Sequence, residues 1–226
     1  MEALEKLLLE RMARREIVEM GRTLAAKRLV AGSWGNISCR AGDGLIAVTP
    51  SGLGYEKTRD EDIVILDMDG NVLKGRRVPS SESRLHLAVY AACPQAGAII
   101  HTHSIYASAL AAMGRDVPAV IEDIVQIIGG SVKCAAYALP GTKQLADNAV
   151  QALAGRKAAL LANHGAVCWG KNLEDALIVA EVLEKAAQIA VICSSCGGAA
   201  ELSAEDAAVM HKFYEEHYSR RQLGGE

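Results

Sequence analysis

The chain has 226 residues, half of them hydrophobic, and its 24 basic and 27 acidic side chains leave a net charge of −3. A chain of this length buries roughly 70% or more of its unfolded surface, so a full core is expected. Without a long basic run, nucleic-acid binding is not expected. No stretch reaches the ~18 apolar residues of a membrane span, and the charged N-terminus does not look like a signal peptide. The sequence predicts a soluble, cytoplasmic protein without membrane contact.

The N-terminal third of the chain predicts one helix followed by two hairpins. Residues 2–30 carry apolar side chains at helical spacing, and the pattern ends at Gly32. The segments "NISCR" and "LIAVTP" then alternate around "AGDG", and Asp-Gly between such segments is a strong hairpin signal. A second hairpin is predicted in "IVILDMDGNVLKG", turning at Asp69 and Gly70. This turn superficially resembles a calcium loop, but its glycine comes too early and no glutamate closes the ring.

The rest of the chain mixes helices with short apolar strands. A helix is predicted after "VPSS", with Ser80 or Ser81 as its cap, and another begins at Ser104 after the strand "AGAIIHT". "GGSVKCAAYA" predicts a strand, "GTKQLADNAVQALAG" a helix, and "KAALLANHGAVCWG" a single buried strand interrupted by polar residues. Helices at about 173–194 and 203–220 follow. With no repeat or linker, we expect residues 1–226 to form a single α/β domain, with a largely antiparallel sheet covered by helices.

Six cysteines are scattered through mostly apolar segments, and we interpret them as reduced core residues. Cys193 and Cys196 have the spacing of a redox pair or of half a zinc site. No second such pair accompanies them, so a structural role is favoured.

Three histidines stand where apolar residues would be expected. His101 and His103 share one face of a predicted strand, so their imidazoles converge at its end. Such a pair can also be two ordinary histidines. His164 adds a third ring within an apolar segment, where burial without a partner would cost ~1–3 kcal/mol. Three imidazoles with an open fourth position are typical of a catalytic zinc site, and nitrogen ligands favour zinc over magnesium.

One carboxylate and three polar loops complete the set of candidate residues. Glu82 begins a predicted helix, where negative charge is favoured, although a glutamate in a first helical turn is common. The loops "GSWGNIS", "TPSG" and "PSSE" expose amides and hydroxyls, which can bind phosphate without a lysine. Taken separately, each loop is an ordinary turn. Phosphate-binding and dinucleotide-binding glycine motifs and a serine-hydrolase elbow are absent from the sequence.

In this order, the motifs "GNIS", "TPSG", "PSSE..LH...Y", "HTHS", "ALPGT" and "NHG" resemble the class II aldolase/adducin family. The likeness runs nearly end to end and is strongest to the L-fuculose-1-phosphate aldolase branch. It implies a three-layer α/β/α domain and a homotetramer with active sites between subunits.

The resemblance also assigns roles to residues. It places one Zn²⁺ per subunit on His101, His103 and His164, with Glu82 as a ligand of the empty site and as the acid/base once substrate is bound. It maps phosphate binding to Gly35, Asn36, Ser51, Gly52, Ser80 and Ser81. The implied reaction is reversible cleavage of a 1-phosphoketose, of the L-fuculose 1-phosphate type, to dihydroxyacetone phosphate and a small aldehyde of the L-lactaldehyde type. Zinc would stabilise the ene-diolate, and Glu82 would move the proton.

The aldehyde side departs from the family pattern. In the fuculose-phosphate enzymes a tyrosine of the neighbouring subunit helps to move a proton, whereas this chain has "VPAVIEDIVQIIGG" in that segment. Glu122 is the candidate for this acid/base work. Tyr214 and Tyr218 are candidates for a second tyrosine near the C-terminus.

Other members of the family share the metal-binding residues. A ribulose-phosphate 4-epimerase typically carries aspartate where this chain has Glu82, which argues against that activity. Dehydratases of methylthioribulose phosphate and decarboxylases of phosphorylated sugar acids stay open as alternatives. An adducin-like binding module would have the fold without the metal, and the presence of three histidines with Glu82 argues against it.

Overall fold

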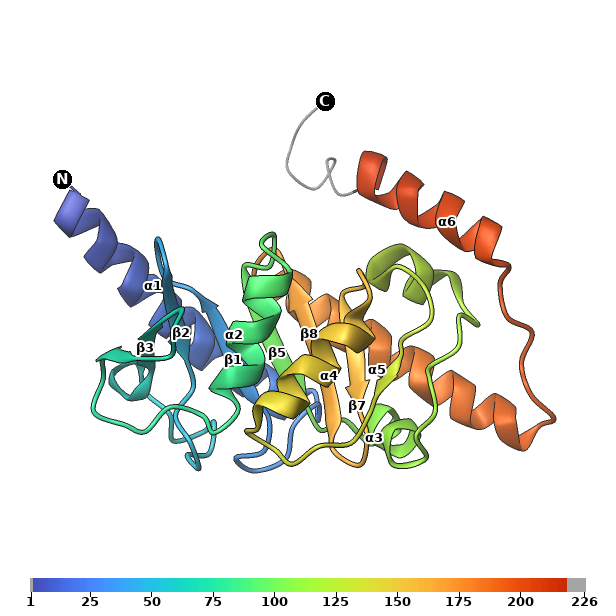
Figure 1. Ribbon diagram of the computed structural model, residues 1–226, viewed down its shortest axis with the longest axis horizontal. Helices are drawn as coiled ribbons and strands as arrows, with labels where there is room; N and C mark the ends of the chain where they lie inside the picture. Colours follow the sequence, from blue (N-terminus) through green and yellow to red (C-terminus); the bar gives the residue numbers. More distant parts are fainter. Residues whose placement is uncertain (1, 219–226) are drawn as a thin grey trace.

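The computed structural model describes residues 2–218, with side chains for 4–217, and contains an eight-stranded sheet (Figure 1). The strand order is β4-β3-β2-β1-β5-β8-β7-β6, and each neighbouring pair is antiparallel except β6 and β7. This confirms the predicted, largely antiparallel sheet. The strands are β1 Asn36–Arg40, β2 Leu45–Val48, β3 Val64–Asp67, β4 Val72–Lys74, β5 Ala98–Thr102, β6 Cys134–Ala135, β7 Ala158–Leu161 and β8 Gly165–Gly170.

Both N-terminal hairpins are confirmed, but the predicted strand through "NHG" is wrong. Strands β1 and β2 pair across the "AGDG" turn, and β3 pairs with β4 across Asp69 and Gly70. The segment at "NHG" is instead a tight turn between two antiparallel strands, β7 and β8. Asn163 adopts a left-handed φ of 56°, and the amide of His164 donates to the carbonyl of Leu161 at 3.0 Å. Asn163 and His164 therefore lie in the turn at the end of the sheet, and Gly165 begins β8.

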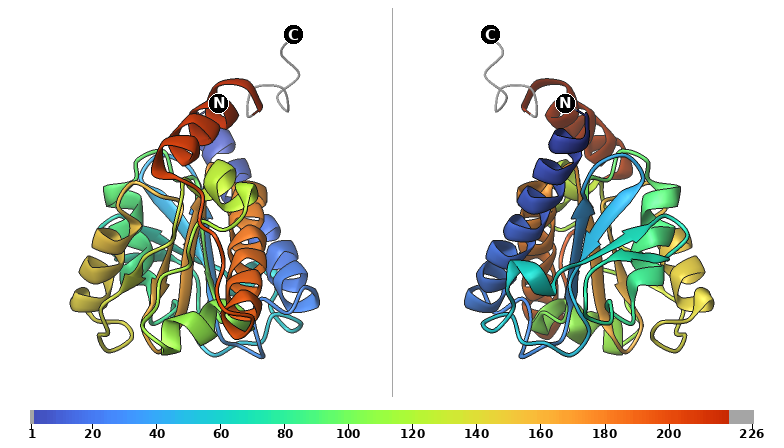
Figure 2. Two further views of the ribbon diagram at one scale, coloured as in Figure 1. Left: turned by 90° about the vertical axis from the view of Figure 1, so that its right-hand side faces the viewer. Right: turned by 90° about the vertical axis from the view of Figure 1, so that its left-hand side faces the viewer.

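Helices cover both faces of the sheet, which confirms the three-layer α/β/α architecture. Helices α2 and α4 lie on one face, and α1, α3 and α5 lie on the other (Figure 2). The two larger buried apolar clusters, one on each side of the sheet, fill the spaces between these layers. The helices are α1 Glu2–Ala26, α2 Ser83–Ala92, α3 Ile105–Ala112, α4 Lys143–Leu153, α5 Leu173–Ser195 and α6 Ala204–Phe213, with short turns η1 Asp60–Asp62, η2 Ile124–Ile128 and η3 Tyr214–Tyr218.

Several predicted helix and strand ends are corrected by local hydrogen bonding. Helix α1 stops at Ala26 rather than near residue 30, because Arg28 turns left-handed with φ 59° and Leu29 donates back to Leu24 at 3.0 Å. The predicted strand "GGSVKCAAYA" is reduced to the two residues of β6.

The predicted serine caps are also corrected. Glu82, and neither Ser80 nor Ser81, holds the N-cap position of α2. Ser104 holds the N-cap position of α3 as predicted, although its hydroxyl makes no capping hydrogen bond.

At the C-terminal end, the predicted helix 203–220 corresponds to α6 followed by η3, and residues 219 and 220 lie outside the described part. No helix within residues 2–218 has the length and apolar character needed to cross a membrane. All six cysteines are free thiols. Cys39, Cys93 and Cys168 are buried as predicted, whereas Cys196 is exposed and is not a core residue.

Candidate active site

The alternation of strand β5 directs His101 to the face of the sheet that α2 covers. Ala98 and Ile100 belong to the apolar cluster on the α5 side, whereas Ile99 belongs to the cluster on the α2 side. His101 lies two residues after Ile99 and so shares its face, and His103 follows directly after the strand end. The imidazole rings of His101 and His103 lie with their centroids 4.7 Å apart. The predicted convergence of the two rings is therefore present.

Two other elements bring the remaining predicted residues to the same point. His164 comes from the turn between β7 and β8, and its ring centroid lies 4.8 Å from that of His101. Glu82 comes from the N-cap of α2, and its Oε2 atom lies 3.1 Å from Nε2 of His101. One potential ligand atom from each of Glu82, His101, His103 and His164 lies within 4.8 Å of all the others. Residues separated by up to 82 positions thus form one compact cluster.

The side chains of the cluster are oriented for a cation. Nδ1 of His101 lies 2.9 Å from the carbonyl oxygen of Ala166 and must donate to it, which leaves Nε2 unprotonated in the neutral ring and directed to the cluster. Oε1 of Glu82 is buried without a hydrogen-bond partner and lies 3.4 Å from Nε2 of His164. An unpartnered buried carboxylate oxygen beside three imidazoles fits a divalent metal, and this donor set is one that zinc accepts.

Burial and neighbouring charge shift the pKa values of His103, His164 and Glu82 toward the forms that bind metals. Burial lowers the pKa of His103 to about 4, and it also lowers the pKa of His164, with the neighbouring His101 adding to both shifts. For Glu82, burial alone would raise the pKa, but His101, His164 and the Asn36 amide together hold it well below its usual range. Neutral imidazoles and an ionised carboxylate are the forms that bind metals.

A pocket of about 690 Å³ opens beside the cluster and contains the predicted phosphate loops. Its lining includes all six residues that the resemblance assigned to phosphate: Gly35, Asn36, Ser51, Gly52, Ser80 and Ser81. Glu82, His103 and His164 form part of the same wall, and His101 is fully buried. The cluster of Glu82 and the histidines thus lies at the same cavity as the polar loops, although sequence spacing gave no sign of their proximity.

Backbone contacts hold these loops in place. Ser51 donates its amide to Val78 at 2.9 Å and Ser80 donates to Thr49 at 3.0 Å, so "TPSG" and "PSSE" lie side by side. The "ALPGT" loop approaches them at Gly141, where a Cβ would come within 2.8 Å of the carbonyl of Ser81. Glycine at this position permits the loop to close over the pocket wall.

Two of the three residues predicted for the aldehyde side, Glu122 and Tyr214, do not line this pocket. Glu122 is exposed just before η2, and Tyr214 is half-buried after α6. Neither is among the residues that line the cavity. The side chain of Tyr218 lies outside the described residues.

Sequence reasoning missed two aromatic residues that line the pocket. Trp34 is 67% exposed, and its ring centroid lies 5.8 Å from that of His103. Tyr137 is 58% exposed, lines the same pocket and directly precedes "ALPGT". A tryptophan within the polar loop "GSWGNIS" was the available signal, because exposed aromatic side chains beside a cavity often contact ligands.

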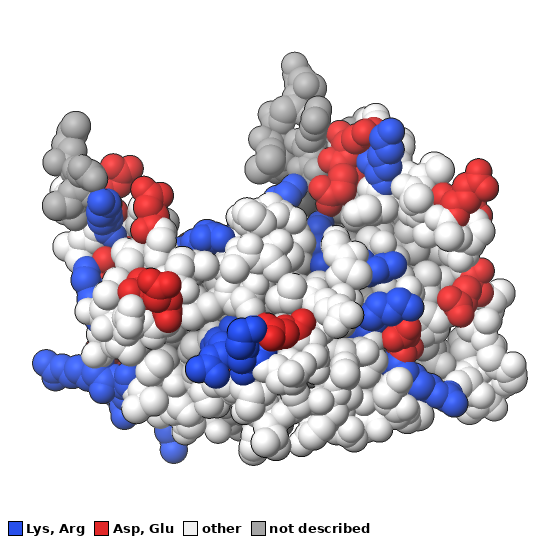
Figure 3. All heavy atoms as spheres, viewed as in Figure 1, with Lys and Arg blue, Asp and Glu red and all other residues white. Residues whose placement is uncertain are grey.

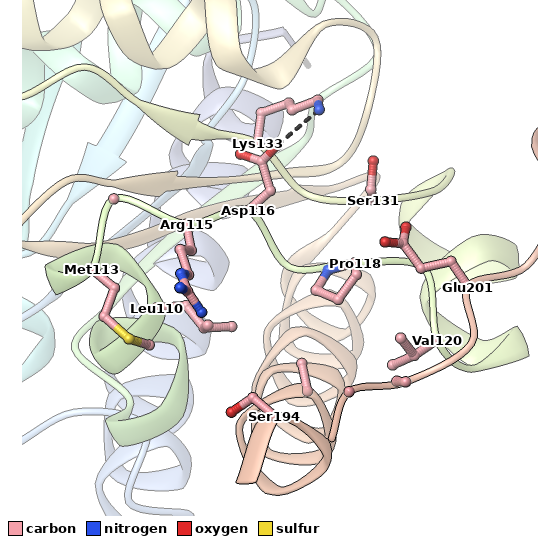
Figure 4. A pocket seen from close by; sticks show the side chains of 14 residues that line it. Leu110, Met113, Arg115, Asp116, Pro118, Val120, Ser131, Lys133, Ser194 and Glu201 are labelled. Carbon is pink, nitrogen blue, oxygen red and sulfur yellow. Dashed lines mark hydrogen bonds and ion pairs between the residues drawn. The ribbon is translucent and has the colours of Figure 1, made fainter. Parts of the chain in front are cut away.

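A second hollow of about 610 Å³ lies away from the histidines, between the ends of α3 and α5 (Figure 4). Arg115, Lys133 and Asp116 line it, and Lys133 pairs with Asp116 at 2.8 Å. It contains none of the candidate site residues.

On the face drawn in Figure 3, basic and acidic side chains lie among one another rather than in separate halves.

Gly165 is expected to be necessary for the close contact between strands β5 and β8 beside the histidine cluster. A Cβ at this position would overlap the carbonyl oxygen of Thr102 and lie 3.3 Å from Cε1 of His101. Gly165→Ala should destabilise the fold by about 1–3 kcal/mol, because two paired backbones must separate. Thermal unfolding should show a fall in Tm of about 2–4 °C for each kcal/mol. Gly54→Ala is the matched control, because a Cβ there meets open space at an ordinary φ. Equal Tm values for the two variants would contradict the proposed contact.

Comparisons with known proteins agree with this geometry. A model of the class II aldolase and adducin N-terminal domain matches residues 15–191. The chain is 44% identical to the 5-deoxy-D-ribulose 1-phosphate aldolase of Bacillus thuringiensis serovar kurstaki, over 81% of this chain and 86% of that protein. It is 38% identical to the L-fuculose phosphate aldolase of Escherichia coli K12, over 77% and 80% of the two chains. A solved structure of L-fuculose 1-phosphate aldolase superposes with a TM-score of 0.87 at 37% identity, covering 90% and 96% of the two chains.

Proposed function

Because the chain belongs to the class II aldolase and adducin family and is a metal-dependent aldolase, we propose that it reversibly cleaves a 1-phosphoketose to dihydroxyacetone phosphate and a small aldehyde. The proposed substrate is of the L-fuculose 1-phosphate type, with L-lactaldehyde as the aldehyde. The observation that carries the proposal is the single cavity in which Glu82, His103 and His164 share a wall with the three polar loops.

The proposed cofactor is one Zn²⁺ per subunit, held by His101, His103 and His164, with Glu82 as a further ligand before substrate binds. The donor set supports this assignment, since the four side chains supply ligand atoms within 4.8 Å of one another. When bound, the metal would supply a Lewis acid for the carbonyl and hydroxyl oxygens of the donor half of the sugar.

Glu82 is the proposed acid/base. Its carboxyl group is buried, and His101, His164 and Asn36 hold its pKa well below the usual range. Asn36 donates to Oε2 at 2.9 Å, while Oε1 has no hydrogen-bond partner. A carboxylate with one oxygen fixed and the other free can take a proton from the donor carbon and return it. No lysine is needed for this chemistry.

The proposed phosphate anchor is formed by the loops at Gly35, Ser51, Gly52, Ser80 and Ser81, whose amides and hydroxyls can hold an anion without a basic side chain. Asn36 stays in the proposal, but its side-chain amide already serves Glu82 and His86. If Asn36 binds phosphate, it would do so through atoms other than its side-chain amide.

A second candidate substrate is 5-deoxyribulose 1-phosphate. It is favoured by the 44% identity to an aldolase named for that sugar. Cleavage between C3 and C4 would give the same donor half and acetaldehyde in place of L-lactaldehyde. The exposed aromatic rings of Trp34 and Tyr137 at the pocket fit an aldehyde with an apolar end.

The proposal includes a homotetramer whose neighbouring subunits complete each site. This arrangement is supported by the position of Glu122 and Tyr214, which lie outside the pocket of their own chain and would act, together with Tyr218, in a neighbour's site. The cytoplasm is the proposed location, which the six free thiols support, since cytosolic thiols are kept reduced.

An aldehyde panel tests the proposed function. Zinc-loaded protein is incubated with dihydroxyacetone phosphate and L-lactaldehyde, acetaldehyde or glycolaldehyde, and the ketose phosphates are identified by mass spectrometry. L-lactaldehyde is expected to give the highest kcat/KM. A higher value for acetaldehyde would favour the second candidate, and a preference for glycolaldehyde would change the substrate while keeping the aldolase reaction. Failure of all three aldehydes to condense would contradict the proposal.

A further inference from the structure

A buried row of polar side chains extends from Glu82 away from the pocket, between helix α2 and strand β1. Glu82, His86 and Tyr90 are spaced four residues apart and so lie on one side of α2. Asn36 and Ser38 are two residues apart and share one face of β1. All five side chains are buried, and His86 and Tyr90 are 1% exposed. Polar groups at such positions are costly unless every one is hydrogen bonded.

The hydrogen bonds join these side chains into one continuous chain. Asn36 Nδ2 lies 2.9 Å from Oε2 of Glu82, and Asn36 Oδ1 lies 2.5 Å from Nε2 of His86. Nδ1 of His86 lies 2.6 Å from the hydroxyl of Ser38, and that hydroxyl lies 2.9 Å from the hydroxyl of Tyr90. The guanidinium of Arg40 lies 4.9 Å above the ring of Tyr90, at the far end of the row.

The chemistry of each group allows a single direction for these bonds. The amide nitrogen of Asn36 donates to Oε2 of Glu82, so the amide oxygen, which can only accept, faces His86. Nε2 of His86 must therefore carry a hydrogen and donate to Asn36. Burial first, and then the neighbouring His101, lower the pKa of His86 to about 3, so its Nδ1 is unprotonated and accepts from Ser38. Tyr90, whose pKa burial raises, completes the row by donating to Ser38.

We propose that His86 is a positioning residue of the aldolase reaction: by donating to Asn36, it fixes the amide that holds the Glu82 carboxylate in its working orientation. Without His86 the Asn36 amide could rotate and present its oxygen to Glu82, which would repel the carboxylate. Oε2 is held by the row, whereas Oε1 stays without a hydrogen-bond partner beside His164. This inference rests on the proposed function, since Glu82 is the acid/base only in that reaction.

The test uses zinc-loaded full-length protein and follows exchange of the donor-carbon proton of dihydroxyacetone phosphate in heavy water. His86→Leu should lower kcat for exchange about 10–100-fold, as losses of outer-shell partners of a metal site do. KM for dihydroxyacetone phosphate should stay close to that of wild type, because His86 itself is not among the groups proposed to bind the phosphate. His86→Gln should recover most of the loss, because its amide can donate to Asn36.

A double-mutant cycle separates positioning from a general effect on the fold. If His86 acts through Asn36, adding His86→Leu to Asn36→Ala should cause no further loss of kcat. Additive losses, or a His86→Gln variant as slow as His86→Leu, would overturn the inference. If His86→Leu does not fold, Ser38→Ala takes its place in the cycle, with a loss of several-fold expected and none in the Asn36→Ala background.

A second measurement does not depend on activity. Nitrogen NMR of metal-free protein labelled at histidine should show His86 protonated at Nε2 alone, and a proton on Nδ1 would overturn the inference. Wild-type protein that exchanges no proton would overturn the proposed function and this inference with it. Normal exchange in both wild type and His86→Leu would overturn the inference alone.

Discussion

Glu82→Gln is expected to retain metal and to lose exchange of the donor-carbon proton by about 10²–10⁴-fold, the usual contribution of a positioned acid/base. Glutamine has the same shape, and its oxygen can still accept from Asn36, so the side chain should stay in place. The three imidazoles that supply the other ligands are unchanged. What is lost is the ionised oxygen that would accept the proton. The measurement is solvent exchange into dihydroxyacetone phosphate, followed by NMR, together with metal content by atomic emission.

The matched control for this variant is Glu16→Gln, a change of the same kind on the exposed side of α1. It should alter neither metal content nor exchange. Exchange at the wild-type rate in Glu82→Gln would remove the role proposed for Glu82. Loss of metal from Glu82→Gln would show instead that the carboxylate is needed chiefly as a ligand.

The sequence predicted the parts of the fold that depend on local pattern. The two N-terminal hairpins were predicted because Asp-Gly turns and alternating residues act over a few positions. The convergence of His101 and His103 followed from the period of a single strand. The same local reasoning placed a strand through "NHG", because apolar residues on both sides of a tight turn look like one buried run. The left-handed conformation of Asn163 is decided by the pairing of β7 with β8.

The sequence predicted which residues form the candidate site, but it did not predict how they come together in space. His164 and Glu82 were singled out from their local contexts, but spacing alone did not connect them with His101, and the resemblance placed all three in one site. The row behind Glu82 was missed for a similar reason. Glu82, His86 and Tyr90 show helical spacing in the sequence, but their meaning depends on Asn36 and Ser38 from a strand more than 40 residues earlier. The register of α2 against β1 is a property of tertiary packing, which no local pattern encodes.

His101→Ala is expected to abolish stable metal binding and to lower kcat/KM by about 10³-fold or more, because several kcal/mol of Lewis-acid stabilisation would be lost. His101 is the fully buried member of the cluster, and its Nδ1 is fixed to the carbonyl of Ala166 at 2.9 Å. Both packing and this hydrogen bond therefore fix the position of its ring. Metal content after dialysis and the rate of condensation with dihydroxyacetone phosphate measure the two effects.

Two further variants make the result of His101→Ala specific. His211→Ala should keep its metal, since the Nδ1 atom of His211 also binds a backbone carbonyl, that of Gln126, but the ring lies outside the cluster. His103→Ala tests the same ligand set at the half-buried pocket wall, where the substitution removes less packing. An unchanged Tm for this variant would separate metal loss from unfolding. If His101→Ala and His103→Ala both keep one metal per chain with unchanged affinity, the assignment of the imidazoles as ligands is wrong. If both variants lose metal while remaining folded, the measured metal loss supports the imidazoles as ligands, in addition to their proximity in the structure.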